Sequence, residues 1–135
     1  MRESKAHQIL LLVISVLLLT LGGWRLLDPV SFFANSGLVL SLENGLLSEA
    51  RATGGVVVGY ALVILFGVSQ PSLRFTAALV APVLFLSFLG GRLVGVVLDG
   101  TPGPELVQGM LAELLLGGLS MLAFVRLRRR DGAAG

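Results

Sequence analysis

Two charged residues lie inside stretches of sequence that are otherwise uncharged and strongly apolar. Arg92 is the only charged residue in the run 75–98, and Glu113 is the only one in the run 106–125. Ionisable groups within membrane-spanning helices are rare, usually face the interior of the protein and usually pair with one another. An arginine and a glutamate in such places could hold helices together, bind a polar ligand or transfer a proton.

The depth of each residue along its helix predicts which charges can meet. At 1.5 Å per residue, Arg92 lies about 9 Å and Glu113 about 12 Å from the same end of two antiparallel helices. Glu113 also shares a helical stripe with Gly109 and Gly117, and stripes of small residues face neighbouring helices. We therefore expect Arg92 to pair with Glu113, with Glu49 as a further candidate partner. The whole polar cluster that we expect in this half of the bundle, in a binding or a structural role, is Glu49, Arg51, Arg92, Asp99 and Glu113.

Four roles are open for this cluster. Its paired charges could only fix which helix packs against which. They could instead line a pocket, open to the outer face, for a small solute, a lipid headgroup or an ion. Glu113 could act as a general acid or base on a lipid-soluble substrate, or the charges could belong to a proton or ion pathway. No nucleophile–histidine pair can be assembled, because the single histidine is His7 near the N-terminus.

The composition indicates the solvent in which these residues work. The chain has 135 residues, of which 55% are hydrophobic and 13% charged, and its mean hydropathy is +0.92. Soluble domains are about 25% charged, and a chain this short has too little interior to bury so much hydrocarbon. A net charge of +2 with no basic face argues against nucleic-acid binding. The absence of cysteine and the single histidine argue against iron–sulfur, haem and zinc sites, so we expect no cofactor and no metal.

The apolar runs predict an all-α fold, a bundle of four transmembrane helices that forms a single domain over residues 1–135. A helix crosses the hydrocarbon with about 20 mostly apolar residues, and four segments reach that length. Turns rich in Pro and Gly separate the last three segments. The first segment could also be a signal peptide, but no cleavage site of small residues follows it. The predicted spans are approximately residues 7–27, 48–68, 74–98 and 104–125.

Within the segment 28–47, the run 29–42 is uncharged but too short to cross the membrane, and Asn35-Ser36-Gly37 interrupts it. Segments of this kind lie in the membrane interface or re-enter the bilayer. Phe32 and Phe33 could anchor it at the level of the lipid headgroups. We expect a partly helical cap over the outer end of the bundle.

The basic residues predict the orientation of the chain. They concentrate in the tail 126–135, near the N-terminus at Arg2 and Lys5, and at Arg74, whereas acidic residues predominate at the opposite ends of the helices. Because cytoplasmic flanks are enriched in Lys and Arg, we expect an integral protein of the bacterial inner (plasma) membrane with both termini cytoplasmic. The tail could also contact anionic lipid, although a role in setting topology is enough to explain it.

Glycine pairs recur in the two halves of the chain. Leu-Gly-Gly followed by arginine and then aspartate occurs at 21–28 and again at 89–99, and glutamate precedes Gly-Gly at 49–55 and 113–118. This pattern indicates a duplicated hairpin, although glycine pairs are also common in unrelated membrane helices. The spacings Gly55-x-x-x-Gly59 and Gly91-x-x-x-Gly95 predict close contacts between helices.

Four motifs occur in a fixed order along the chain: Glu49-x-Arg51-x-x-Gly54-Gly55, Gly91-Arg92-x-x-Gly95, Asp99-Gly100-x-Pro102 and then Glu113. With these motifs the chain, over about residues 12–124, resembles a family of small bacterial four-span membrane proteins that is catalogued only as a domain of unknown function. The resemblance implies an integral membrane protein with four helices and implies no activity. It also implies that Arg51, Arg92, Asp99 and Glu113 are the polar signature of the family.

These observations favour a binding or accessory protein with an outward-open polar pocket, surrounded by the lipid bilayer and in contact with a second copy or a membrane partner protein. A lipid or solute touching Arg51 or Arg92 would mark this function. A small intramembrane enzyme would instead have a hydrocarbon-lined cavity that reaches Glu113. An oligomeric small-solute transporter would need a polar path from Arg92 toward Arg74, yet the run 75–89 contains no charged residue.

Overall fold

The computed structural model describes residues 4–135, and these residues form helices connected by short turns and one longer loop. Four helices are long and apolar enough to cross a membrane, which confirms the predicted all-α, four-helix fold. Arg2, one of the basic residues expected to flank the first span, lies outside the described residues. The helical segments are α1 (Lys5–Leu27), α2 (Pro29–Asn35), α3 (Asn44–Ser69), the short 3-10 helix η1 (Pro71–Leu73), α4 (Arg74–Asp99) and α5 (Pro104–Ala133).

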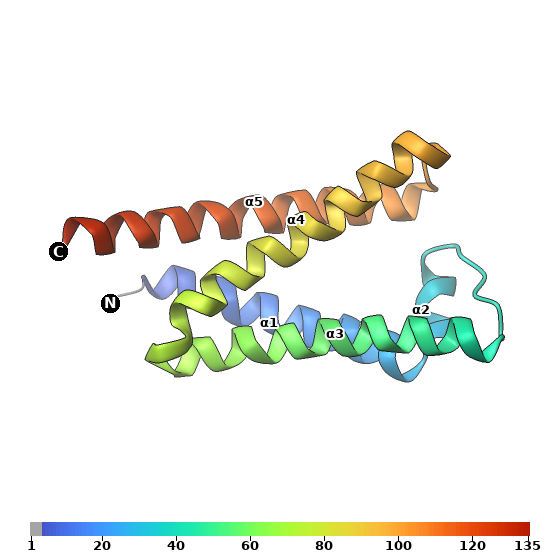
Figure 1. Ribbon diagram of the computed structural model, residues 1–135, viewed down its shortest axis with the longest axis horizontal. Coiled ribbons are helices and arrows are strands. Elements are labelled where there is room, and N and C mark those ends of the chain that lie inside the picture. The colour runs from blue at the N-terminus through green and yellow to red at the C-terminus, as the bar shows by residue number, and fades with distance from the viewer. Residues whose placement is uncertain (1–3) are drawn as a thin grey trace.

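The long helices are arranged as two hairpins. α1 packs along α3, and α4 packs along α5 (Figure 1). α4 begins beside the end of α3, to which η1 connects it, and then crosses the bundle to lie against α5. The beginning of α1 and the end of α5 are therefore at the same end of the bundle, whereas α2 is at the opposite end. The basic tail is not separate from the last helix, because α5 continues to Ala133.

The segment between α1 and α3 contains a seven-residue helix and an irregular loop. Asp28 separates α1 from α2: its backbone N–H donates to Trp24 at 2.8 Å, and its carboxylate accepts from the N–H of Ser31 at 3.1 Å. Pro29 then begins α2, where its fixed φ suits the first helical turn. Gly37, with φ of 72°, lies just beyond the end of α2, in a conformation that glycine adopts without strain. The cap is partly helical as expected, and its place in the membrane interface stays a prediction.

The core of the bundle lies where α1, α3 and α4 meet. Apolar residues recur on these helices at spacings of three and four, so each helix presents one continuous face to the others. A smaller cluster of Ala78, Phe124 and Leu127 joins α4 to α5 nearer the chain termini. The buried residues of the main cluster are Leu11, Ile14, Leu18, Val57, Ala61, Ile64, Ala77, Ala81, Leu84 and Phe85.

Large apolar side chains also cover the outside of the bundle. Val16 on α1, Val83 on α4 and Leu122 on α5 are 54%, 48% and 58% exposed, and all three lie well inside their helices. A soluble protein rarely exposes apolar surface on this scale, whereas lipid tails solvate it without cost. Together with the length of the four helices, this surface identifies an integral membrane protein.

Close contact between helices occurs at Gly117, in the stripe that Glu113 shares, where a Cβ atom would lie 2.8 Å from the side chain of Leu86, and at Gly54, outside the expected stripes. A Cβ atom at Gly54 would lie 2.6 Å from the backbone nitrogen of Leu26, so α1 and α3 touch through their backbones here. By contrast, a Cβ atom at Gly59, Gly91 or Gly95 would meet no atom of the described chain within 4 Å. The expectation of close contacts at those positions is wrong, because spacing alone does not show which side of a helix faces a neighbour.

Gly54→Ala should therefore destabilise the bundle, whereas Gly59→Ala on the same helix should not. The added methyl group at position 54 has to displace backbone, and overpacking of this kind costs about 1–3 kcal/mol. At position 59 the methyl group enters open space, and alanine favours the helix. Thermal unfolding of both variants in mild detergent measures the difference. Equal midpoints for the two variants would contradict the backbone contact between α1 and α3.

Candidate functional site

A cavity of about 530 Å³ lies between the two hairpins, toward the end of the bundle that carries α2. It forms because α4 leaves α3 and follows α5, so the second hairpin diverges from the first toward this end (Figure 1). Its wall combines apolar and aromatic side chains with a few polar groups. The lining residues are Leu18, Leu21, Gly22, Arg25, Phe32, Phe33, Ser36, Leu38, Val57, Ser87, Phe88, Gly91, Arg92, Leu106 and Glu113.

The ion pair of Arg92 and Glu113 forms one polar side of this cavity. The Nε atom of Arg92 donates to both carboxylate oxygens of Glu113, at 3.0 and 3.2 Å. The side chain of Glu113 is only 13% exposed, whereas that of Arg92 is 34% exposed. The pair joins α4 to α5, and Arg92 keeps part of its guanidinium surface open toward the cavity. A group of this kind can hold helices together and still bind a ligand.

Arg25, near the end of α1, is a second cation in the cavity wall. Its Nε atom donates to the backbone carbonyl of Ala50 at 3.2 Å, which connects α1 to α3. Its guanidinium carbon lies 4.9 Å from the ring centre of Phe33 and 5.8 Å from that of Phe32. Arginine over an aromatic face is a favourable cation–π arrangement. α2 thus helps to hold Arg25 in place.

Three residues of the expected cluster lie elsewhere. Arg51 is exposed and donates from one guanidinium nitrogen to the carbonyl oxygens of Leu26 at 2.6 Å and Leu27 at 2.8 Å. These carbonyls lie at the C-terminus of α1, where no further helical turn can accept their lone pairs. Glu49 on α3 and Asp99 at the end of α4 are exposed and do not line the cavity. The structure therefore brings together Arg92 and Glu113 but not the other three residues.

The residues that sequence reasoning missed are Arg25 and the aromatic pair Phe32 and Phe33. One signal for Arg25 was available, because Leu21-Gly-Gly-Trp-Arg25 parallels Leu89-Gly-Gly-Arg92 in the repeated pattern. Both arginines line the same cavity. Their common location was not derivable from depth along the helix, since depth leaves the rotation of each helix undetermined.

The chemistry of the cavity fits an amphipathic molecule. Two guanidinium groups and one carboxylate leave a net positive charge of one in its wall, and Ser36 and Ser87 add hydroxyl groups. Leucine, valine and phenylalanine side chains provide most of the remaining surface. Among the described residues, no group of three or more His, Asp or Glu side chains is placed to hold a metal ion. The arrangement can receive an apolar body whose polar end carries negative charge or hydrogen-bond acceptors.

Comparison with known proteins agrees with the resemblance found in the sequence. A family model described as a domain of unknown function (DUF4345) matches residues 6–124, which include every residue that lines the cavity. The predicted membership of a domain-of-unknown-function family is confirmed. No curated protein and no solved structure matches the chain.

The pairing of Arg92 with Glu113 predicts a coupled effect on stability. Arg92→Gln and Glu113→Gln should each lower the free energy of unfolding by about 1–3 kcal/mol, because each leaves one charge without its partner. The double variant should lose less than the sum of the two single effects. Thermal unfolding of all three variants in mild detergent gives the coupling.

Strictly additive effects would contradict the ion pair. Single variants as stable as the wild type would show that the fold does not depend on these charges. Residues that cost stability or contribute none are often kept for function, so that result would turn attention to the cavity.

Proposed function

We propose that this integral membrane protein, which belongs to the DUF4345 family of domains of unknown function, binds an amphipathic small molecule in the cavity between its hairpins. The observation that carries the proposal is the composition of the cavity wall, in which Arg25, Arg92 and Glu113 interrupt an otherwise apolar and aromatic lining. Ligand sites in proteins have this composition, and a volume of about 530 Å³ lies within their usual range.

The polar end of the ligand sits between Arg25 and Arg92. Arg92 already shares its charge with Glu113, so it offers the ligand only the guanidinium surface that faces the cavity. Arg25 is engaged by a carbonyl oxygen and two aromatic rings, all of which are uncharged partners. A negatively charged or strongly accepting headgroup therefore gains most from Arg25, since hydrogen bonds between ionised groups are about twice as strong as neutral ones.

The apolar part of the ligand lies along the helices. Leu18 and Leu21 of α1, Val57 of α3 and Phe88 of α4 form the apolar wall of the cavity. Burial of hydrocarbon on these side chains adds little free energy to a molecule that comes from the bilayer, because lipid tails are equally apolar. The charged groups therefore decide which molecule is retained, and the apolar wall decides its size.

A second candidate function is supported by one observation. The largely hydrocarbon-lined cavity reaches Glu113, as a small intramembrane enzyme with Glu113 as acid or base would require. Both oxygens of this carboxylate accept from the Nε atom of Arg92, at 3.0 and 3.2 Å. Wild-type protein that carries a chemically altered form of the molecule bound by Glu113→Gln would favour the enzyme. An identical bound molecule in both proteins would favour binding alone.

The cavity gives less support to the transporter hypothesis than to binding or to an enzyme. On α4, the cavity wall consists of residues between Ser87 and Arg92, so the cavity does not extend along α4 to Arg74. The polar path that transport would use is not part of this cavity.

Closing the cavity should remove the ligand. Gly91 lines the cavity, and a side chain there would enter open space, so Gly91→Leu fills the cavity without a clash. Gly90→Leu is the matched control, because Gly90 is also open but does not line the cavity. Native mass spectrometry of the full-length chain purified from its membrane should find a bound amphipathic molecule in the wild type and in Gly90→Leu, and about tenfold less of it in Gly91→Leu. Equal occupancy in the two variants would overturn the proposed site.

The proposed orientation places both termini in the cytoplasm and the cavity in the outer half of a plasma membrane. Lys5 and the basic end of α5 support it, because cytoplasmic flanks are enriched in basic residues. A reporter enzyme that is active only in the cytoplasm, fused after Gly135, should be active, and a reporter active only outside should not. The reverse result would place the cavity in the inner half of the membrane.

A further inference from the structure

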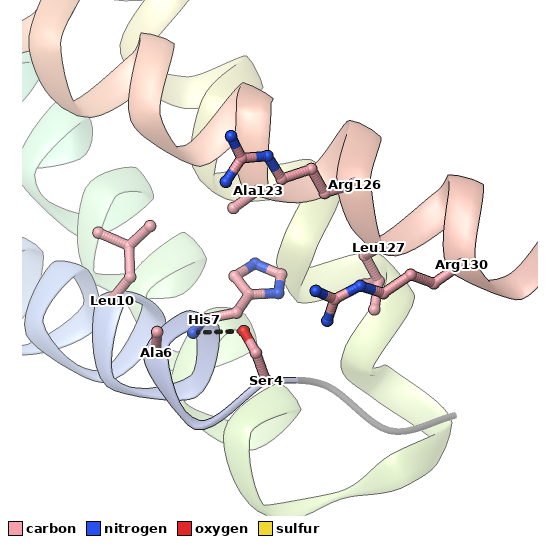
Figure 2. A pocket seen from close by; sticks show the side chains of 8 residues that line it. All are labelled: Ser4, Ala6, His7, Leu10, Ala123, Arg126, Leu127 and Arg130. Carbon is pink, nitrogen blue, oxygen red and sulfur yellow. Dashed lines mark hydrogen bonds between the residues drawn. The ribbon is translucent and has the colours of Figure 1, made fainter.

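A second pocket, of about 180 Å³, lies at the opposite end of the bundle, where α1 begins beside the end of α5. Figure 2 shows the residues that form it, which come from these two helices and from Ser4, the residue that caps α1. The pocket is separate from the cavity described above and shares none of its lining residues. Its wall consists of Ser4, Ala6, His7, Leu10, Ala123, Arg126, Leu127 and Arg130.

The polar side of this pocket is strongly basic. Arg126 and Arg130 are four residues apart on α5 and therefore share one face of the helix. His7 is buried and lines the same pocket as the two arginines (Figure 2). Ser4 places its hydroxyl at the edge, where the oxygen accepts from the N–H of His7 at 3.2 Å. Among the described residues that line the pocket, none carries a carboxylate to balance the two guanidinium charges.

Packing fixes this arrangement. Leu127, between the two arginines in sequence, is only 4% exposed and belongs to the cluster that joins α4 to α5. Because Leu127 points into the bundle, the rotation of this last part of α5 is set. Arg126 and Arg130 are thereby directed toward α1 and line the pocket, whereas Arg128 and Arg129 do not line it, although all four side chains are partly open to the outside. The tail thus contains two arginines in a pocket and two on the open surface.

The pocket also lies at a defined level of the membrane. Arg126 is the first charged residue after the uncharged run 114–125 of α5, and the uncharged part of α1 begins at Ala6. The hydrocarbon region therefore ends here, and phospholipid phosphates lie just beyond the hydrocarbon. We infer that this pocket binds a phosphate group, held by Arg126 and Arg130.

Phosphate suits the pocket better than a simple carboxylate does. Its several oxygens can accept from two separate guanidinium groups at once, and arginine is the preferred side chain for phosphate recognition. The Ser4 hydroxyl is a further polar group at the same pocket. The phosphate can belong to the headgroup of an anionic lipid in the adjacent leaflet or to a soluble phosphate compound. Both sources offer the same chemistry to the two arginines.

The test compares two variants that remove the same charge from the same tail. R126Q/R130Q empties the pocket of both arginines, whereas R128Q/R129Q removes two arginines from the open surface. All four arginine side chains are exposed, so both variants should fold. Thermal unfolding of each variant checks that it does. The cavity at the other end is intact in both, so ligand bound there contributes equally. Full-length protein is delipidated in detergent and titrated with phosphatidylglycerol, with phosphatidylcholine as the uncharged-headgroup comparison, and bound lipid is counted by native mass spectrometry.

A second arm of the experiment identifies the source of the phosphate. The unfolding temperature of each protein is measured with inorganic phosphate and with chloride at equal ionic strength. Stabilisation of the wild type and of R128Q/R129Q by phosphate, absent in R126Q/R130Q, would support the pocket and indicate a soluble ligand. Binding of phosphatidylglycerol with no effect of inorganic phosphate would support it and indicate a lipid headgroup.

The expected result is that R126Q/R130Q binds phosphatidylglycerol about tenfold or more weakly than the wild type, because each arginine supplies charge-assisted hydrogen bonds. R128Q/R129Q should bind within about twofold of the wild type, since diffuse surface charges are screened by salt. Equal losses in the two variants would show that the tail attracts lipid only by its total charge and would overturn the site. Failure of the wild type to respond to lipid or to phosphate would overturn it as well.

Discussion

A charge within apolar helices has to find its partner inside the protein, and the structure is organised around this constraint. Arg92 meets it with Glu113, which joins α4 to α5. Arg25 meets it with a carbonyl oxygen of α3 and two aromatic rings of α2. Arg51 meets it with the last carbonyl oxygens of α1. Each arginine connects helices of the same hairpin, so the charges stabilise the hairpins and leave the space between them open.

The pairing of helices explains why both pockets lie where they do. Within the first hairpin, the absent side chain of Gly54 lets the backbones of α1 and α3 touch. Within the second, the ion pair and the cluster of Ala78, Phe124 and Leu127 join α4 to α5. α1 and α5 belong to different hairpins and meet over only a short length. The cavity lies between the hairpins toward the end that carries α2, and the basic pocket lies at the opposite end, where α1 and α5 meet.

The sequence predicts those features of the structure that depend on distance along the chain. The four helices follow from runs of about 20 apolar residues, and the contact of Arg92 with Glu113 follows from their similar depth. The features that the sequence does not predict depend on the rotation of each helix about its axis. Gly59 and Gly95 have the spacing of a contact stripe yet face open space, whereas Gly54, which precedes Gly55 on α3, touches the backbone of α1. Arg51 lies near the beginning of α3 as expected, but its long side chain reaches carbonyl oxygens of α1 and not the carboxylates of the cluster.

The difference between the two hairpins indicates which arginine is available to a ligand. Arg25 and Arg92 follow the same Leu-Gly-Gly pattern, and both line the cavity. The returning helices each carry a glutamate, but only Glu113 faces its arginine, since Glu49 is exposed on α3. The segment with α2 lies between α1 and α3, and it supplies Phe32 and Phe33 where a carboxylate stands in the second hairpin. Arg25 therefore keeps a positive charge that no carboxylate neutralises within the described chain. In the second hairpin, Glu113 pairs with Arg92. An anionic headgroup in the cavity would pair with Arg25 in the same way.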